Sequence, residues 1–194
     1  MTGSPHLRIV TDGDDTPRPA QGRTPTAQHI KVRRALPRDV TVIDSLVQQY
    51  AVDRILLPKE LVGYYEDVQE FLVAEDTVSG EVIGCGALHV MWSDLAEIRT
   101  LAVHPRRKGQ GVGYQLVQGL LTRARELGLS RVFCLTFEIE FFLRQGFREI
   151  EGTPVTPEVY AELLRSHDDG VAEFLDLARV KPNTLGNARM LIDL

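Results

Sequence analysis

The chain contains few of the residues on which disulfide bonds, metal sites and membrane spans depend. Only two cysteines occur among its 194 residues, Cys85 and Cys134, and neither forms a Cys-x-x-Cys pair or has a histidine beside it. We therefore expect no metal and two buried, reduced thiols, as in a cytoplasmic protein. No apolar run is long enough to cross a bilayer, and no secretory apolar segment follows the N-terminus, so neither membrane association nor export is expected.

Positive charge is also in short supply. The chain carries 22 Lys and Arg against 27 Asp and Glu, a net charge of −5, and its densest basic run is Arg106, Arg107 and Lys108. Nucleic-acid binding needs a basic face, so no nucleic-acid partner is expected. The composition is otherwise ordinary, with 43% hydrophobic and 25% charged residues, and the length is that of one globular domain.

The most informative segment is LAVHPRRKGQGVGY, residues 101–114. A short apolar strand ends at Pro105, a basic glycine-rich loop follows, and a helical pattern begins directly after the loop. Gly109, Gly111 and Gly113 leave backbone N–H groups uncovered and the helix N-terminus adds partial positive charge, so the segment predicts a pyrophosphate site. It matches neither the P-loop nor the Gly-x-Gly-x-x-Gly dinucleotide fingerprint. The alternative interpretation is a solvated basic turn.

The order of apolar patterns predicts an α/β domain with a mixed sheet. Residues 1–28 are rich in turn residues and show no period, which predicts a disordered tail, and one domain is expected over residues 29–194. Predicted strands lie at residues 30–32, 71–74, 82–91, 97–103, 132–137, 147–150 and 188–192. Predicted helices lie at 37–50, 59–68, 112–127, 140–145 and 157–167, the last ended by Asp168, Asp169 and Gly170.

The glycine loop resembles the acyl-CoA loop of the GNAT acetyltransferase superfamily, which has the pattern Arg/Gln-x-x-Gly-x-Gly/Ala after a Val-x-Pro strand end. Lys108 stands at the Arg/Gln position, followed by Gly111 and Gly113; a register that begins at Arg106 fits the glycines but breaks the proline spacing. Lysine keeps the charge of arginine and loses its planar fork. The resemblance implies a mostly antiparallel sheet of six or seven strands flanked by helices, and acetyl-CoA as co-substrate.

In this superfamily the strand before the loop and the strand after the next helix splay apart, and acyl-CoA lies between them. The resemblance therefore assigns Leu101, Ala102 and Val103 to the edge that binds pantetheine. Many members carry a tyrosine at the position of Phe142 that protonates the departing thiolate; phenylalanine cannot, so we expect unassisted or water-assisted departure. For Phe142 and its neighbour Phe141, the alternative is that they form the hydrophobic face of a helix. The co-substrate residues implied are Lys108, Gly109, Gln110, Gly111, Val112, Gly113, Tyr114, Phe141, Phe142 and Arg144.

Further segments narrow the resemblance to the catalytic domain of N-acetylglutamate synthases, over roughly residues 30–194. The long synthases also carry an amino-acid-kinase-like domain that binds arginine, so this chain looks like the short, stand-alone form. The long forms often have two arginines where this chain has Pro58 and Lys59. The segments are ILLPK at 55–59, GCGAL at 84–88, AEIRTLAV at 96–103, and LT at 135–136 before FFLRQGF at 141–147.

The narrower resemblance implies transfer of acetyl from acetyl-CoA to the α-amino group of L-glutamate, the first step of arginine biosynthesis. The transfer would be direct, in a ternary complex. Both carboxylates of such an acceptor need cationic partners, and the candidates are Lys59, Arg99 and Arg189, with Asn187 beside the last. A solvated surface charge is the alternative for each.

The candidate base that would deprotonate the acceptor ammonium is Glu97, because bases in this superfamily are often a glutamate on the strand before the loop. A core-edge or salt-bridged glutamate is the alternative, and Glu138 and His89 are weaker candidates. Other functions stay open: acetylation of a protein N-terminus, a lysine or another small amine, or a non-catalytic acyl-CoA-binding regulatory domain. Whether the acceptor is glutamate or glutamine also stays open, as does whether the protein forms a homodimer.

Overall fold

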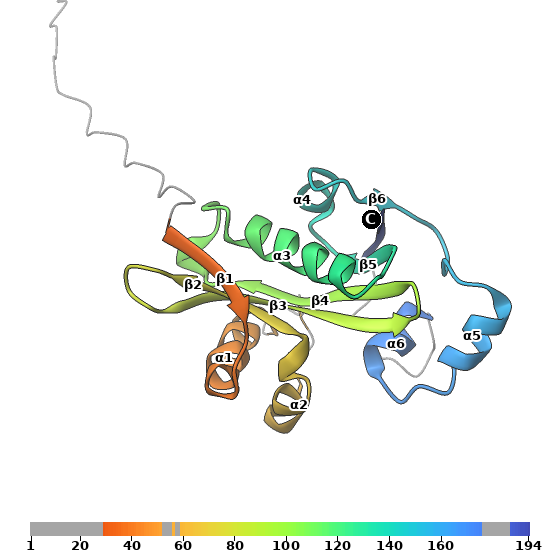
Figure 1. Ribbon diagram of the computed structural model, residues 1–194, viewed down its shortest axis with the longest axis horizontal. Coiled ribbons are helices and arrows are strands. Elements are labelled where there is room, and N and C mark those ends of the chain that lie inside the picture. The colour runs from red at the N-terminus through yellow and green to blue at the C-terminus, as the bar shows by residue number, and fades with distance from the viewer. Residues whose placement is uncertain (1–28, 52–55, 57–58, 176–186) are drawn as a thin grey trace, which may run out of the picture.

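A computed structural model describes residues 29–51, 56, 59–175 and 187–194. The tail predicted at residues 1–28 lies outside these residues. One seven-stranded sheet forms the centre of the molecule, in the order β1-β2-β3-β4-β5-β7-β6 (Figure 1). Its strands are β1 (Ile30–Arg34), β2 (Phe71–Asp76), β3 (Val82–Trp92), β4 (Leu95–Val103), β5 (Arg131–Thr136), β6 (Arg148–Glu149) and β7 (Ala188–Asp193).

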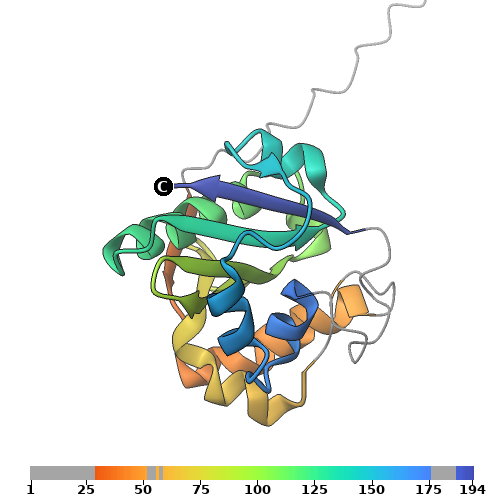
Figure 2. The ribbon, with the colours of Figure 1, turned by 90° about the vertical axis from the view of Figure 1, so that its right-hand side faces the viewer.

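Helices cover both faces of the sheet. The long helix α3 and the short α4 lie on one face, and the remaining helices lie on the other (Figure 1; Figure 2). No helix of the described residues is long and apolar enough to span a membrane. The helices are α1 (Val40–Ala51), α2 (Leu61–Glu66), α3 (Val112–Glu126), α4 (Ile139–Leu143), α5 (Pro157–Leu163) and α6 (Asp169–Phe174), with 3₁₀ turns η2 (Pro37–Asp39), η3 (Val68–Glu70) and η4 (Pro105–Arg107).

The predicted α/β fold class and the strand order along the chain are confirmed, but one prediction near the C-terminus is wrong. Asp168, Asp169 and Gly170 do not end a helix that runs to residue 167; α5 ends at Leu163, and these residues begin α6. The Asp168 carboxylate accepts a hydrogen bond from the Val171 N–H at 2.9 Å. Aspartate favours the N-cap of a helix and disfavours its interior, so the same residue type fits both assignments.

The central feature of the sheet is the parallel pair β4–β5. All other strand pairs are antiparallel. The two strands pair over Leu95–Arg131, Ala96–Val132 and Glu97–Phe133 and no further along their described lengths. Because a parallel pair needs a crossover connection, α3 runs back from the end of β4 to the start of β5. The strands diverge beyond Glu97 and Phe133, and the sheet opens between them.

A β-bulge lies in β4 where the strand leaves its partner. Opposite β3, Cys85 pairs with Ala102 but Ala87 pairs with Arg99, so β4 contains one extra residue. Within it Thr100 has a φ of 57°, in the left-handed region that β-branched residues seldom adopt. Such a conformation costs about 1–3 kcal/mol and persists only where the surrounding structure imposes it. The bulge bends β4 at the opening of the sheet.

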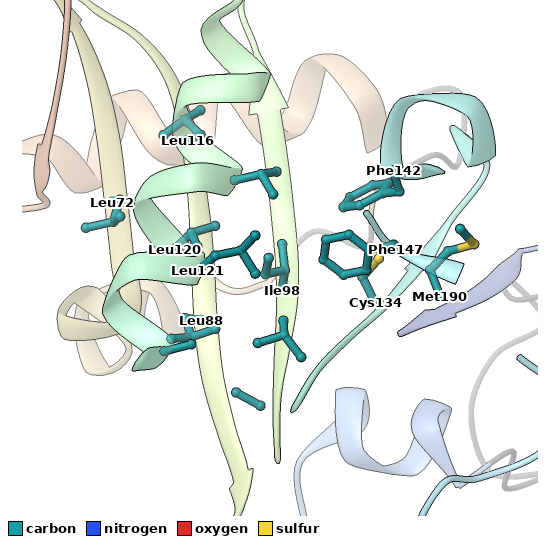
Figure 3. Packing of buried hydrophobic residues seen from close by; sticks show 14 of the residues in the cluster. Leu72, Leu88, Ile98, Leu116, Leu120, Leu121, Cys134, Phe142, Phe147 and Met190 are labelled. Carbon is teal, nitrogen blue, oxygen red and sulfur yellow. The ribbon is translucent and has the colours of Figure 1, made fainter. Parts of the chain in front are cut away.

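The main hydrophobic core fills the space between α3 and the sheet. Figure 3 shows Leu116, Leu120 and Leu121 of α3 facing the strands, with Phe142 and Phe147 at the α4 end of the same cluster. Helix α3 lies very close to β3: a Cβ on Gly84 would stand 3.0 Å from Val112 Cγ1. This packing fixes the start of α3, and therefore the glycine loop before it, against the strands.

Replacement of Leu120 by alanine should destabilise the fold strongly. The side chain is 0% exposed, and a Leu→Ala change in a well-packed core costs about 3–5 kcal/mol through lost burial and the cavity left behind. Urea unfolding measures the difference. The matched control is Leu127→Ala at the end of α3, where leucine is 53% exposed; equal effects of the two substitutions would contradict the core assignment.

Candidate active site

A cleft of about 520 Å³ occupies the opening between β4 and β5. One wall is the edge of β4, the other is the end of β5 with α4, and the glycine loop closes one end. Tyr50, Leu56 and Asn187 complete the lining. The other lining residues are Ile98, Arg99, Thr100, Leu101, Val103, Arg107, Lys108, Gly109, Gly111, Val112, Gly113, Tyr114, Leu135, Thr136, Phe137, Glu138, Phe141, Phe142 and Arg144.

The glycine loop has the backbone that an anion site needs. Gly109 and Gly111 have φ values of 76° and 82°, and Gly111 is the N-cap residue of α3. A Cβ on either glycine would meet no atom within 4 Å, so the need for glycine is conformational and not steric. The first N–H groups of a helix lack intrahelical partners, and they can bind an anion together with the helix dipole.

Two cations of the loop, Arg107 and Lys108, are placed differently. Arg107 forms an ion pair with Asp76 Oδ2 at 2.5 Å, so its charge already has a partner within the protein. Lys108 Nζ lies 4.8 Å from the centroid of the Tyr50 ring. Because Tyr50 and Lys108 both line the cleft, the lysine charge stands at the loop end of the site.

The sequence analysis did not identify Tyr50 as a site residue, because it stands only as the last residue of the helix predicted at residues 37–50. Its hydroxyl donates a hydrogen bond to the carbonyl of Val103 on β4. The separation of 53 residues explains the omission, because no local spacing connects α1 with the end of β4.

The phenylalanines beside the cleft form an edge-to-face stack. The ring centroids of Phe141 and Phe142 are 5.1 Å apart, as are those of Phe142 and Phe147. Phe142 is only 4% exposed and belongs to the main core. Phe141 lies against the loop, since a Cβ on Gly113 would stand 3.3 Å from its Cζ. Both the packing role and the cleft-lining role therefore apply to this pair.

Arg99 lies at the other end of the cleft and is paired with two carboxylates. Its Nη1 donates to Asp168 Oδ1 at 2.8 Å and its Nη2 to Glu70 Oε2 at 3.2 Å. Glu70 Oε1 in turn lies 2.7 Å from Nδ1 of His89. The Arg99 side chain is only 11% exposed, so the alternative of a solvated surface charge does not hold. Burial opposes the charged form, but Glu97, Asp168 and Glu70 outweigh it and raise the pKa of Arg99.

Glu97 lies beside Arg99 and beneath α6, outside the cleft lining. It is 3% exposed, and its Oε2 atom has no hydrogen-bond partner among the described residues. Burial raises its pKa to about 8, although Arg99 acts in the opposite direction. Gly170 of α6 covers the pair so closely that a Cβ there would stand 2.6 Å from Arg99 Nη1 and 3.2 Å from Glu97 Oε2. If Glu97 acted as a base, its negative charge would lie beside Arg99, which already pairs with Asp168 and Glu70.

The other predicted acceptor residues are divided between the cleft and elsewhere. Asn187 lines the cleft, and its Oδ1 is buried without a hydrogen-bond partner in the part of the chain that the structure describes. Lys59 pairs with Asp67 at 2.6 Å. Arg189 donates to the Gly152 carbonyl at 3.0 Å and its guanidinium lies 5.2 Å from the Phe133 ring centroid. Neither cation is among the residues that line the cleft.

Two predicted co-substrate residues also lie outside the lining. Ala102 is 2% exposed and packs in the core beneath α1, and the Gln110 side chain donates to the Arg106 carbonyl at 3.0 Å. Glu138, a weaker base candidate, lines the cleft. Across residues 29–51, 59–175 and 187–194, no group of three or more His, Cys, Asp or Glu side chains could hold a metal ion.

Comparison with known proteins identifies relatives of the chain. Residues 41–147 match the model of the acetyltransferase (GNAT) family. An amino-acid acetyltransferase of Mycobacterium tuberculosis is 62% identical over 162 residues, which are 83% of this chain and 92% of that protein. An amino-acid acetyltransferase of Aeromonas salmonicida is 32% identical over 129 residues, 64% of this chain but only 29% of the longer relative.

The chain is also similar to solved structures. A Mycobacterium tuberculosis protein crystallised in complex with CoA and NLQ has 62% sequence identity and a TM-score of 0.82, over 84% of this chain and 99% of that one. N-acetylglutamate synthase from Neisseria gonorrhoeae, complexed with coenzyme A and N-acetyl-glutamate, has a TM-score of 0.67 over 85% of this chain and 35% of that one. At 23% identity the second similarity shows the fold alone.

Replacement of Glu97 by glutamine should change how stability depends on pH. Above the ordinary carboxyl pKa of 4.5 the unfolded chain loses this proton, whereas the folded protein keeps it up to about pH 8. The parent should therefore lose up to about 1.4 kcal/mol of unfolding free energy per pH unit in this window. Glutamine does not ionise, so the advantage of the variant should grow from about pH 5 to about pH 8.

Urea unfolding at several pH values measures this difference. Glu126→Gln, an exposed position at the end of α3, is the control and should keep the pH dependence of the parent. Parallel curves for Glu97→Gln and the parent would show that the folded state does not hold the Glu97 proton.

Proposed function

This chain belongs to the GNAT family of acetyltransferases, and from that membership we propose that it transfers the acetyl group of acetyl-CoA to the α-amino group of an amino acid, L-glutamate. The proposal rests foremost on one observation: a single cleft joins a glycine loop suited to an anion with Arg99 and Asn187, two side chains suited to an amino acid. The 62% identical amino-acid acetyltransferase, of which the chain covers 92%, supports the same reaction.

The loop and the edge of β4 are proposed to hold the co-substrate. The N–H groups at the start of α3 and the Lys108 ammonium would bind the diphosphate. The exposed groups of β4 near Leu101 and Val103 would pair with the amides of the pantetheine arm, as an added strand pairs with a sheet edge. Acetyl-CoA supplies the activated acetyl group as a thioester.

The chain contributes proximity, polarisation and proton transfer to the reaction. An N–H group at the edge of β4, near the bulge at Thr100, is suited to polarise the thioester carbonyl, and binding both substrates in one cleft replaces a bimolecular encounter. We assign the base role to Glu97, which acts through water because it does not line the cleft. Phe142 cannot donate a proton, so α4 contributes no acid at that position.

Arg99 is proposed to orient the acceptor. Arg99 lines the cleft, and its guanidinium has N–H groups beyond those given to Asp168 and Glu70. Its charge, however, is already offset by these two carboxylates. That observation favours a second acceptor, L-glutamine, whose neutral carboxamide needs no full counter-charge and can donate an N–H to the unpartnered Asn187 Oδ1.

Three further assignments belong to the same proposal. We propose that residues 29–194 form one acetyltransferase domain, that the reaction serves arginine biosynthesis, and that it takes place in the cytoplasm. The 62% identical amino-acid acetyltransferase, which aligns with 83% of this chain, supports these assignments.

An acceptor screen tests the function directly. Release of free CoA from acetyl-CoA, measured with each of the common amino acids, should be fastest with glutamate or glutamine. Aspartate is one methylene shorter and should be roughly tenfold or more poorer in kcat/KM. A ratio that favours glutamine would assign the carboxamide acceptor. If the protein binds acetyl-CoA but produces no free CoA from it with any amino acid, the result would contradict an enzymatic function. It would favour a regulatory acyl-CoA-binding domain.

Substitution of Gly111 by valine tests the loop. A β-branched residue cannot keep the φ of 82° without strain, so the N–H groups should move and the affinity for acetyl-CoA should fall roughly tenfold or more, about 1.4 kcal/mol. Isothermal titration calorimetry measures this affinity. Gly80→Val introduces similar strain, at a φ of 74° in the β2–β3 turn, and should leave the affinity unchanged. Unchanged binding by folded Gly111→Val protein would contradict the loop assignment.

A further inference from the structure

We propose that Tyr50 is a binding residue for the acyl-CoA co-substrate, with its hydroxyl directed to the pantetheine arm and its ring to the lysine that binds the diphosphate. The inference rests on the proposed function and extends it to a residue on α1. Tyr50 lines the cleft, and it contacts both the end of β4 and the glycine loop.

The hydroxyl acts at the edge of β4. The His104 N–H donates to the Ile83 carbonyl at 2.9 Å, so this N–H points towards β3. Backbone groups of successive strand residues point to opposite sides, and those of Val103 therefore point away from β3 and into the opening of the sheet. The Tyr50 hydroxyl donates to this carbonyl and holds it in place.

This hydrogen bond leaves other hydrogen-bond acceptor sites available in the cleft. A carbonyl oxygen has a second lone pair, and a phenol that donates its proton keeps its own oxygen as an acceptor. The amide N–H of a pantetheine arm can therefore bind to Val103, to Tyr50, or to both. Tyr50 thus adds one hydrogen-bond acceptor to the edge of β4.

The ring of Tyr50 acts on the loop. Arg107 is paired with Asp76, whereas the Lys108 ammonium lies 4.8 Å from the Tyr50 centroid. A lysine side chain loses considerable rotamer freedom when it is fixed. The ring already restricts Lys108 near the loop N–H groups, so less of this entropy is lost when a diphosphate binds.

A packing role does not account for the hydroxyl. The buried face of α1 is formed by Val40, Ile43, Leu46 and Val47, and Tyr50 is only partly buried at the end of that face. Phenylalanine would fill the same space. The hydroxyl and the ring can therefore be tested separately, the first by Tyr50→Phe and the second by Tyr50→Leu.

The test measures binding of two acetyl thioesters by calorimetry: acetyl-CoA, and S-acetylpantetheine, which has no phosphate. Tyr50→Phe should weaken both by a similar factor, about three- to tenfold, the loss expected for one hydrogen bond. Tyr50→Leu should weaken acetyl-CoA by about a further two- to fivefold, because the contact with Lys108 is lost as well. That further loss should be absent with S-acetylpantetheine and in a Lys108→Met background.

Tyr65→Phe is the matched control, since Tyr65 is 44% exposed on α2 and does not line the cleft. Thermal unfolding checks that each variant is folded, and Tyr50→Phe decides alone if the leucine variant is not. In steady-state kinetics Tyr50→Phe should raise the KM for acetyl-CoA by a larger factor than it lowers kcat, as expected of a residue that acts on binding.

The outcomes separate this inference from the function on which it rests. A parent protein that binds no acetyl-CoA would overturn both. A parent that binds acetyl-CoA, together with a folded Tyr50→Phe variant that binds both thioesters equally well, would overturn only the role of Tyr50.

Discussion

The short parallel pairing of β4 with β5 is the constraint on which the rest of the site depends. Because the strands pair over only three residue pairs, their edges beyond Glu97 and Phe133 stay open, and backbone groups there are available to another molecule. Because the pair is parallel, α3 must cross between the strands, and its N-terminus then lies at the wide end of the opening. One topological choice thus places an exposed strand edge, a helix N-terminus and a glycine loop around one cleft.

The sequence predicted those parts of the site that lie close together along the chain. The segment from Leu101 to Tyr114 carries the strand end, the glycines and the helix start in one run, so its geometry follows from local rules. The same holds for the helix and strand patterns, whose periods depend on neighbouring residues. Asp168 was misassigned because one residue type serves both to end a helix and to cap the next one.

The rest of the site is assembled from distant segments and left no local signal. Arg99 was correctly placed on the strand before the loop, but its partners Glu70 and Asp168 lie 29 and 69 residues away. The contact of Tyr50 with Val103 spans 53 residues. Lys59 and Arg189 have the right chemistry for a carboxylate, yet the fold directs them to Asp67 and to the Gly152 carbonyl. Residue type indicates what a side chain can bind, whereas long-range packing decides what it does bind.

The position of Asp168 links the local order of a helix to the charge of the cleft. A single oxygen, Oδ1, accepts both the Val171 N–H at 2.9 Å and Arg99 Nη1 at 2.8 Å. The first turn of α6 and the Arg99 guanidinium therefore share one acceptor atom. Any ligand that draws Arg99 away from this oxygen leaves the hydrogen bond to Val171 in place but removes the ion pair that orients the capping carboxylate. Amide hydrogen exchange in α6 thus becomes a remote reporter of occupancy at the acceptor end of the cleft.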